Sequence, residues 1–473
     1  MRRRSVNTVL ALAGAGILAG CLPTYRATPE LARVAPPEAW RETVPGSAAI
    51  DARWWRGFGD PVLAGLVEAA LVRNSDVLIA VARVDEARAQ ADLAQAARLP
   101  ALNLALGVQN GRSLQTAGLG TTTAIQPALQ ANWELDLFGR LRNQVRAADL
   151  QFRATQAERD AAALAVAAAT AQNYIGLLAL DAQLGITRET VASRAEALRL
   201  AQDQARVGYI SQLQLTQAQS EYESVLGSIP ELELAVRRQE NAVRLLAGEL
   251  PGAVARNGAN SAANAAGFAA LRLPPVPGVL PSQLLARRPD VAQRELLLAA
   301  SSANLAVRRQ AFLPQVSLSA QLGRLFVDAL DYDPVTVWTL GGSVLAPLFS
   351  GGRLEAQYEA AGSQRDQAAF AYRRTVLTAF SEVENALAGV PRLAEQVDHA
   401  VRRRDILGRS LFYAHDRYQA GYASYLEELD AQRNLYQVEI NLVTLQRTQL
   451  ENLIGLYRAL GGGWTSAGVR PGN

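Results

Sequence analysis

The side chains that most often carry out chemistry are scarce in this sequence. Its 473 residues include two histidines, His399 and His415, one cysteine, Cys21, and no lysine. Two histidines are too few for a catalytic triad together with a metal site, and one cysteine excludes internal disulfides, paired-cysteine redox chemistry and zinc knuckles. Without lysine there is no Walker-type phosphate site and no Schiff base. We therefore predict no catalytic residues, no metal site and no bound cofactor.

The one cysteine stands where it could be modified. A basic start and a ten-residue apolar stretch, 9–18, have the order of a secretory signal peptide, and this stretch is too short to span a bilayer. The sequence LAGC that ends at Cys21 resembles the bacterial lipobox, after which the cysteine becomes the lipidated first residue. We expect residues 1–20 to be a signal peptide and 21–59 a lipidated, extended segment. An ordinary signal peptide with an incidental cysteine is the alternative.

The charge balance argues against nucleic acid as a partner. The formal net charge is +3, and three arginines in the expected signal peptide supply all of that excess. A neutral mature chain lacks the basic surface that nucleic-acid binding requires. The acylated cysteine instead makes membrane lipid an expected partner.

The sequence contains a long internal repeat. The motif at Pro100 recurs at Pro314, and Gly208-Tyr209 recurs as Gly421-Tyr422, each about 213 or 214 residues later. The expected order is a first repeat at 60–248, an irregular linker at 249–280, a second repeat at 281–460 and a loosely packed tail at 461–473.

Each repeat contains two segments in which apolar and polar residues alternate. Alternating segments of about ten residues are typical of transmembrane β-strands, although a soluble sandwich with one solvated face alternates equally well. Because the chain has the features of an exported lipoprotein and only four such segments, we favour transmembrane strands over a soluble sandwich. The predicted strands are residues 101–110, 123–137, 315–324 and 335–348.

Long helices flank these strands. One helical stretch precedes each strand pair, and two helices joined by a short turn follow it, with a leucine-rich seam typical of a coiled coil. The stretches before the strands are 62–98 and 290–312. The predicted hairpin helices are 141–205 with 213–248, and 354–418 with 425–460.

Four strands cannot close a barrel by themselves. Open strand edges in lipid leave backbone groups unpaired, and eight strands, the smallest usual barrel, have an interior filled by side chains. A dimer would therefore give no useful lumen, whereas a trimer would give twelve strands and a pore. The expected fold is an α+β membrane protein that works as an obligate homotrimer.

Several motifs resemble those of the TolC-like outer-membrane efflux proteins, in particular the lipoprotein branch of the NodT type. The resemblance covers nearly the whole mature chain. The motifs are WWRGFGDPVL (54–63), NWELDLFGR (132–140), LARRPD (285–290), RYQAGYASYLEELDAQRNLY (417–436) and ALGGGW (459–464).

This resemblance implies a trimer with a 12-stranded outer-membrane barrel that continues into a long periplasmic α-helical barrel. It implies a passive duct that exports small molecules, docked to a periplasmic adaptor and to an inner-membrane transporter of the RND type. A duct for type I protein secretion is the alternative with the same fold. A periplasmic coiled-coil scaffold lipoprotein is the alternative of another class.

The resemblance also implies site residues. The turns Gly208-Tyr209 and Gly421-Tyr422 correspond to adaptor contacts. A periplasmic gate corresponds to Leu426 and Asp430, which a spacing of four places on one helix face, and Arg433 could pair with Asp430. Glu427 and Glu428 are expected to add negative charge near the periplasmic opening of the duct. His415 lies near this tip and is expected to be an ordinary surface histidine.

Overall fold

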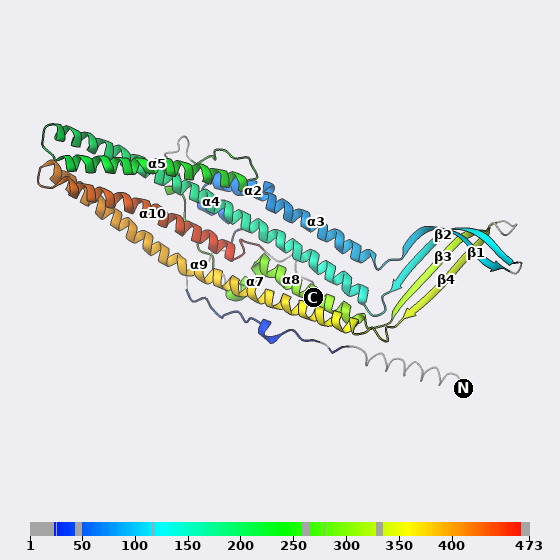
Figure 1. Cartoon of the computed structure of the whole chain (residues 1–473). Helices are drawn as coiled ribbons and strands as arrows, with labels where there is room; N and C mark the ends of the chain where they lie inside the picture. The colour runs from blue at the N-terminus through cyan, green and yellow to red at the C-terminus, as the bar shows by residue number, and fades with distance from the viewer. Residues whose placement is uncertain are drawn as a thin grey trace.

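The computed structural model describes residues 23–24, 26–42, 50–115, 118–257, 265–278, 280–327 and 334–464. The molecule is elongated, with a β-sheet at one end and helical hairpins that run to the opposite end (Figure 1). The expected signal peptide and Cys21 lie outside the described residues. Outside the two repeats' main elements, the described residues include the short elements η1 (Glu30–Ala32), η2 (Trp54–Phe58) and α6 (Ala265–Ala269).

The two repeats have the same order of elements. In the first these are α2 (Pro61–Arg73), α3 (Ser75–Ala96), β1 (Ala101–Gln115), β2 (Gly118–Leu135), α4 (Arg140–Arg206) and α5 (Gln212–Leu246). In the second they are α7 (Pro281–Arg287), α8 (Pro289–Gln310), β3 (Gln315–Val327), β4 (Val335–Leu345), α9 (Arg353–Gln419) and α10 (Tyr425–Ala459). The four hairpin helices match the predicted ranges to within two residues at each end.

The helical stretch predicted at 62–98 is present but consists of two helices, α2 and α3. It divides at Asn74, whose side-chain oxygen accepts hydrogen bonds from the backbone N–H groups of Asp76 and Val77 and so caps α3. The Asn74 side-chain amide also donates to the carbonyl of Leu246, at the end of α5. The break therefore fixes α2 and α3 against the first hairpin.

The strand ends also differ from prediction, for local reasons. β2 ends before Asp136, because that carboxylate accepts hydrogen bonds from the backbone N–H groups of Leu141 (3.0 Å) and Arg142 (2.8 Å) at the start of α4. β4 ends two residues before Pro347, which has no N–H to donate to a strand neighbour. β1 is longer than predicted, since its pairing with β2 continues to Gln115.

The four strands form one antiparallel sheet in the order β1-β2-β3-β4. Side chains from all four strands line up across it. The register places Leu104, Leu129, Leu322 and Trp338 in one continuous row. The adjacent row is Asn103, Gln130, Gln321 and Thr339. Because neighbouring residues point to opposite faces, the sheet has an apolar face and a polar face.

The main hydrophobic core lies in the middle of the helical region. There the rings of Trp54 and Tyr457 stack with centroids 5.5 Å apart, and Tyr174 of α4 is fully buried. Within the described residues, α4 is the one helix that is both long enough and apolar enough to cross a membrane. However, 61% of its most apolar 18-residue segment is buried inside the protein. We therefore assign α4 to this core.

Each hairpin returns to the core at a glycine that touches the backbone of another helix. At Gly248, after α5, an added Cβ would lie 2.4 Å from the carbonyl oxygen of Arg73. At Gly461, after α10, it would lie 1.8 Å from the carbonyl oxygen of Arg287. Both glycines have a positive φ, 71° and 89°. The two repeats therefore use the same close contact at equivalent positions.

The prediction of a loosely packed tail is wrong for its first residues. Gly461, Gly462 and Gly463 form a turn with positive φ that packs against the core, and Trp464 donates its indole N–H to Asp160 at 2.8 Å. Three successive glycines here permit close backbone contact rather than disorder. Residues 465–473 lie outside the described range.

Candidate functional site

Both hairpins end in the same turn. Gly208 and Gly421 have φ values of 77° and 75°, a region that favours glycine. Beyond them, the backbone N–H of Tyr209 donates to Gln204, and that of Tyr422 donates to Arg417, each at 2.8 Å, which closes a Schellman-type cap. The tyrosine side chains are 84% and 80% exposed. The turns thus present one aromatic ring each at the far end of the molecule.

The residues predicted to form a gate divide into two groups. Leu426 and Asp430 lie on the exposed face of the first turns of α10, one helical turn apart. Glu427 is also exposed, and its carboxylate lies 3.9 Å from Arg417 on α9. The side chains of these three residues are therefore available at the outer surface of one chain.

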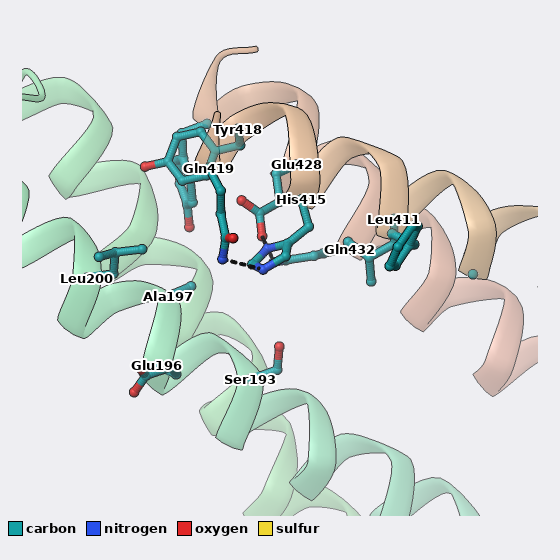
Figure 2. A pocket seen from close by; sticks show the side chains of 13 residues that line it. Ser193, Glu196, Ala197, Leu200, Leu411, His415, Tyr418, Gln419, Glu428 and Gln432 are labelled. Carbon is teal, nitrogen blue, oxygen red and sulfur yellow. Dashed lines mark hydrogen bonds and ion pairs between the residues drawn. The ribbon is translucent and has the colours of Figure 1, made fainter. Parts of the chain in front are cut away.

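Glu428 does not lie with them at the exposed surface, although its charge had suggested the same position near the channel opening. It is 5% exposed and points into the hairpin, where its carboxylate contacts Nδ1 of His415 at 2.8 Å (Figure 2). The Gln432 side-chain amide donates to the same carboxylate, and that of Gln419 lies 2.8 Å from Nε2 of His415. His415 is therefore exposed, as predicted for a surface histidine, and it also bridges α9 and α10.

This cluster borders a cavity between the two hairpins. The cavity has a volume of about 590 Å³, is partly open to solvent, and is lined by α4 on one side and by α9 and α10 on the other. Its wall combines aromatic rings of Phe412, Tyr418 and Tyr425 with the carboxylates of Glu196 and Glu428. Near their ends, the two hairpins of one chain are thus separated by a cavity with both aromatic and acidic lining residues.

An ion-pair network connects the hairpins beside this cavity. Arg433 of α10 pairs with Glu221 of α5, and Glu221 also lies 3.5 Å from the buried guanidinium of Arg194 on α4. The hydrogen bond from Arg433 lowers the pKa of Glu221 and outweighs the opposing effect of burial. Arg433 also contacts Asp430 at 3.6 Å, as the spacing of three had suggested.

Glu221 and Arg194 were not identified from the sequence. A signal existed, because the two residues lie at almost equal distances before and after Gly208 and so must meet across an antiparallel hairpin. The contact with Arg433 had no such signal, since it joins different repeats. Among the residues that the structure describes, no group of three or more His, Cys, Asp or Glu could hold a metal ion.

The apolar face of the sheet is exposed. Leu104 and Trp338 are 78% and 74% exposed, and Leu129 and Leu322 of the same row are about half exposed. A continuous exposed row of large apolar residues marks a surface that another apolar phase covers. With polar side chains on the opposite face, the sheet has the pattern of strands that separate lipid from a water-filled interior.

Comparison with known proteins decides the family. The sequence profile described as outer membrane efflux protein matches residues 66–249 and 280–462, which together make up most of the chain and coincide with the two repeats. The chain belongs to the outer membrane efflux protein family. Its sheet is therefore the part that crosses the outer membrane, and its helices extend into the periplasm.

Individual relatives agree over nearly the full length. The pyoverdine export outer membrane protein OpmQ of Pseudomonas putida is 33% identical over 455 residues, which cover 92% of this chain and 94% of that protein. The probable outer membrane lipoprotein SilC of Salmonella typhimurium is 30% identical over 97% of this chain and 98% of its own. The Campylobacter jejuni CmeC outer membrane channel has the same fold, with a TM-score of 0.83, 24% identity and coverage of 94% and 96%.

Proposed function

We propose that three copies of this chain form a continuous passive duct through the outer membrane and periplasm. The observation that carries the proposal is the sheet, whose apolar face is exposed and whose strands β1 and β4 each have a strand partner on one side only among the described residues. Unpaired strand edges in lipid cost several kcal/mol per backbone group. Three sheets joined edge to edge give twelve strands, enough for a water-filled barrel.

The proposed partners are a periplasmic adaptor and an inner-membrane transporter of the RND type, with small organic molecules as cargo. The exposed turn tyrosines, Tyr209 and Tyr422, support contact with an adaptor, because interfaces are enriched in exposed aromatic residues. A relative named for pyoverdine export supports a small-molecule cargo. The duct itself supplies no energy, so the transporter selects the cargo.

The gate is proposed at the ends of the hairpins. Three copies of Leu426 and of Asp430 around a threefold axis would form an apolar ring and an acidic ring, and an acidic ring favours cations. The pair between Arg433 and Glu221 supports this assignment, because it joins the two hairpins of one chain. A gate that opens by moving one hairpin away from the other must break that pair.

The chain is further proposed to be anchored by lipid on Cys21. The lipobox-like sequence supports this, as does the relative named as a lipoprotein. Multiple acyl chains give stable attachment, since each buried CH₂ contributes about 0.8 kcal/mol.

Reconstitution tests the duct. We expect the purified protein to migrate as a trimer that dissociates on heating and to form discrete conducting channels in a planar lipid bilayer. A monomer that remains in solution and never conducts would instead favour a periplasmic scaffold. Secretion of a polypeptide through the channel, with no effect of its loss on small-molecule export, would favour the type I alternative.

The proposed gate should respond to acid. The lowered pKa of Glu221 means that its pair with Arg433 is fully present above the ordinary value of 4.5 and is lost as the pH falls below it. We expect channel conductance to stay flat at neutral pH and to rise only once the pH falls below the ordinary value of 4.5. Glu221→Gln should already conduct at pH 7 and lose this rise. An identical acid response in Glu221→Gln would assign the effect to other groups.

A further inference from the structure

The described part of the N-terminal segment, 23–24 and 26–42, lies along α9 and is called the strap here. Tyr358 donates its hydroxyl to the carbonyl of Thr24 at 2.8 Å, near the start of α9. Much farther along the same helix, Glu384 accepts the backbone N–H of Arg41 at 3.2 Å. The strap therefore runs in the same direction as α9, from the sheet end toward the hairpin end (Figure 1).

The strap is close to its maximum length. From Thr24 to Glu42, an extended chain spans at most about 60 Å. The stretch of α9 that these residues contact, from Tyr358 to Arg392, is about 51 Å long. A nearly taut segment leaves little freedom in where its first residue lies, as long as its contacts hold.

Arg365 makes the central contact. Its side chain is 2% exposed, and its guanidinium donates hydrogen bonds to the carbonyl oxygens of Arg26 and Ala27, the latter at 2.7 Å. Asp366 pairs with Arg365 at 2.7 Å and with Arg26 at 2.6 Å, so one carboxylate contacts both guanidinium groups. A buried guanidinium that uses its donors on backbone carbonyls binds the strap whatever the strap's side chains are.

Neighbouring residues make room for this contact and continue it. Gly362, one turn before Asp366, faces Arg26, and a Cβ there would lie 2.9 Å from the Arg26 guanidinium. Beyond Thr24, the carbonyl of Pro23 accepts a hydrogen bond from Arg309, next to the last residue of α8. Pro23 is thereby held where α8 gives way to the sheet.

We propose that Arg365 is a clasp that fixes the strap on α9 and so presents the start of the mature chain at the membrane end of the helices. Two more residues reach Cys21, and two residues span at most about 7 Å. A lipid on Cys21 would therefore enter the membrane beside the sheet of its own chain. The consequence for the lipid rests on the lipidation proposed above, whereas the clasp does not.

The rate of trypsin cleavage within the strap tests whether Arg365 holds the strap on α9. Arg33 is an exposed cleavage site within the strap, and cleavage there requires the strap to leave α9. In the detergent-solubilised full-length oligomer we expect Arg365→Met to be cut at Arg33 at least about ten-fold faster than wild type. Arg373→Met, at an exposed arginine of the same helix, serves as the matched control and should be cut at the wild-type rate.

A distance measurement separates strap position from general loosening. Spin labels on Ala27→Cys and Glu359→Cys should give a narrow distance distribution in the parent protein and a broad one with Arg365→Met. The heat stability of the oligomer should be unchanged. Should Arg365→Met fail to assemble, Arg26→Ala removes the ion pair with Asp366 and Tyr358→Phe removes the hydrogen bond to Thr24, so these variants test the contacts on either side of the clasp. Equal cleavage rates and equal distances in all of these variants would overturn the clasp.

The lipid is tested separately. The mass of the N-terminal tryptic peptide reports whether Cys21 is acylated, and a Cys21→Ser chain, exported behind a cleavable signal peptide, lacks the lipid. We expect the Cys21→Ser chain to keep the wild-type protection at Arg33, because the clasp is a contact within the protein. An unacylated wild-type peptide would refute the lipidation and leave the clasp standing. Loss of protection in Cys21→Ser would show that the membrane anchor, not Arg365, holds the strap.

Discussion

Replacing Arg433 with alanine is expected to raise the time-averaged conductance of the reconstituted channel at least about ten-fold at neutral pH. Arg433 is the cation that joins α10 to Glu221 of the first hairpin. Because its side chain is 49% exposed, one pair contributes at most about 1 kcal/mol. Three pairs broken together in a concerted opening amount to about 3 kcal/mol, or two orders of magnitude in the ratio of open to closed channels.

Arg447→Ala is the matched control for this experiment. Arg447 lies on the same helix and is similarly exposed, but its ion pair, with Glu451 at 2.7 Å, stays within α10. We expect its conductance to equal that of wild type. Asp430→Ala should also raise the conductance, because it shortens a side chain that narrows the proposed gate and removes a contact of Arg433. If Arg433→Ala and Asp430→Ala both conduct like wild type, the gate lies elsewhere, while the duct is unaffected.

Gly461→Ala is expected to destabilise the fold by at least about 3 kcal/mol, which lies at the upper end of single-substitution effects. The new Cβ would meet a backbone carbonyl at 1.8 Å, and alanine is strained at a φ of 89°. Since the obstacle is backbone, no side-chain rotation relieves it. The measurements are the yield of assembled oligomer and its midpoint of thermal dissociation.

Gly455→Ala provides the comparison within α10. No atom lies within 4 Å of the position where its Cβ would be, and its backbone is helical. Alanine at such a site should be neutral or stabilise by up to about 1 kcal/mol. Equal stability of the two variants would mean that the backbone around Gly461 can move to accommodate a Cβ. The close contacts at Gly248 and Gly461 would then not be required for stability.

Much of the fold was predictable because its signals are periodic. The alternation in β1 and the repeat of Gly208 at Gly421 are properties of sequence alone, and both led to the observed elements. The break at Asn74 was missed although asparagine is a preferred helix cap with its own local signal. The strap carries no periodic pattern, and Arg365 resembles any arginine on a long helix, so their contact could not be predicted.

The site was predictable in part. The resemblance pointed to Leu426 and Asp430, and their spacing of four predicted that they share one helix face. Glu428 was grouped with them because of its charge, yet its spacing from Tyr425 and Gln432 places it on the buried stripe of α10. The helical periodicity of the buried residues therefore predicts an inward-facing Glu428, and its charge alone does not indicate an exposed position. Its partner His415 belongs to another helix, so that contact needed the structure.

The matching contacts at Gly248 and Gly461 have an implication for the origin of the architecture. A half-length ancestor with one hairpin would have enclosed the same cylinder with six identical copies, and any constriction would have had sixfold symmetry. Fusion of two such chains reduces the number of subunits from six to three. It also allows the sequences of the two hairpins in each chain to diverge. Here the proposed gate takes Asp430 and Arg433 from the later half and Glu221 from the earlier one, so the two halves supply complementary partners, and a substitution in one half affects the contact made by the other.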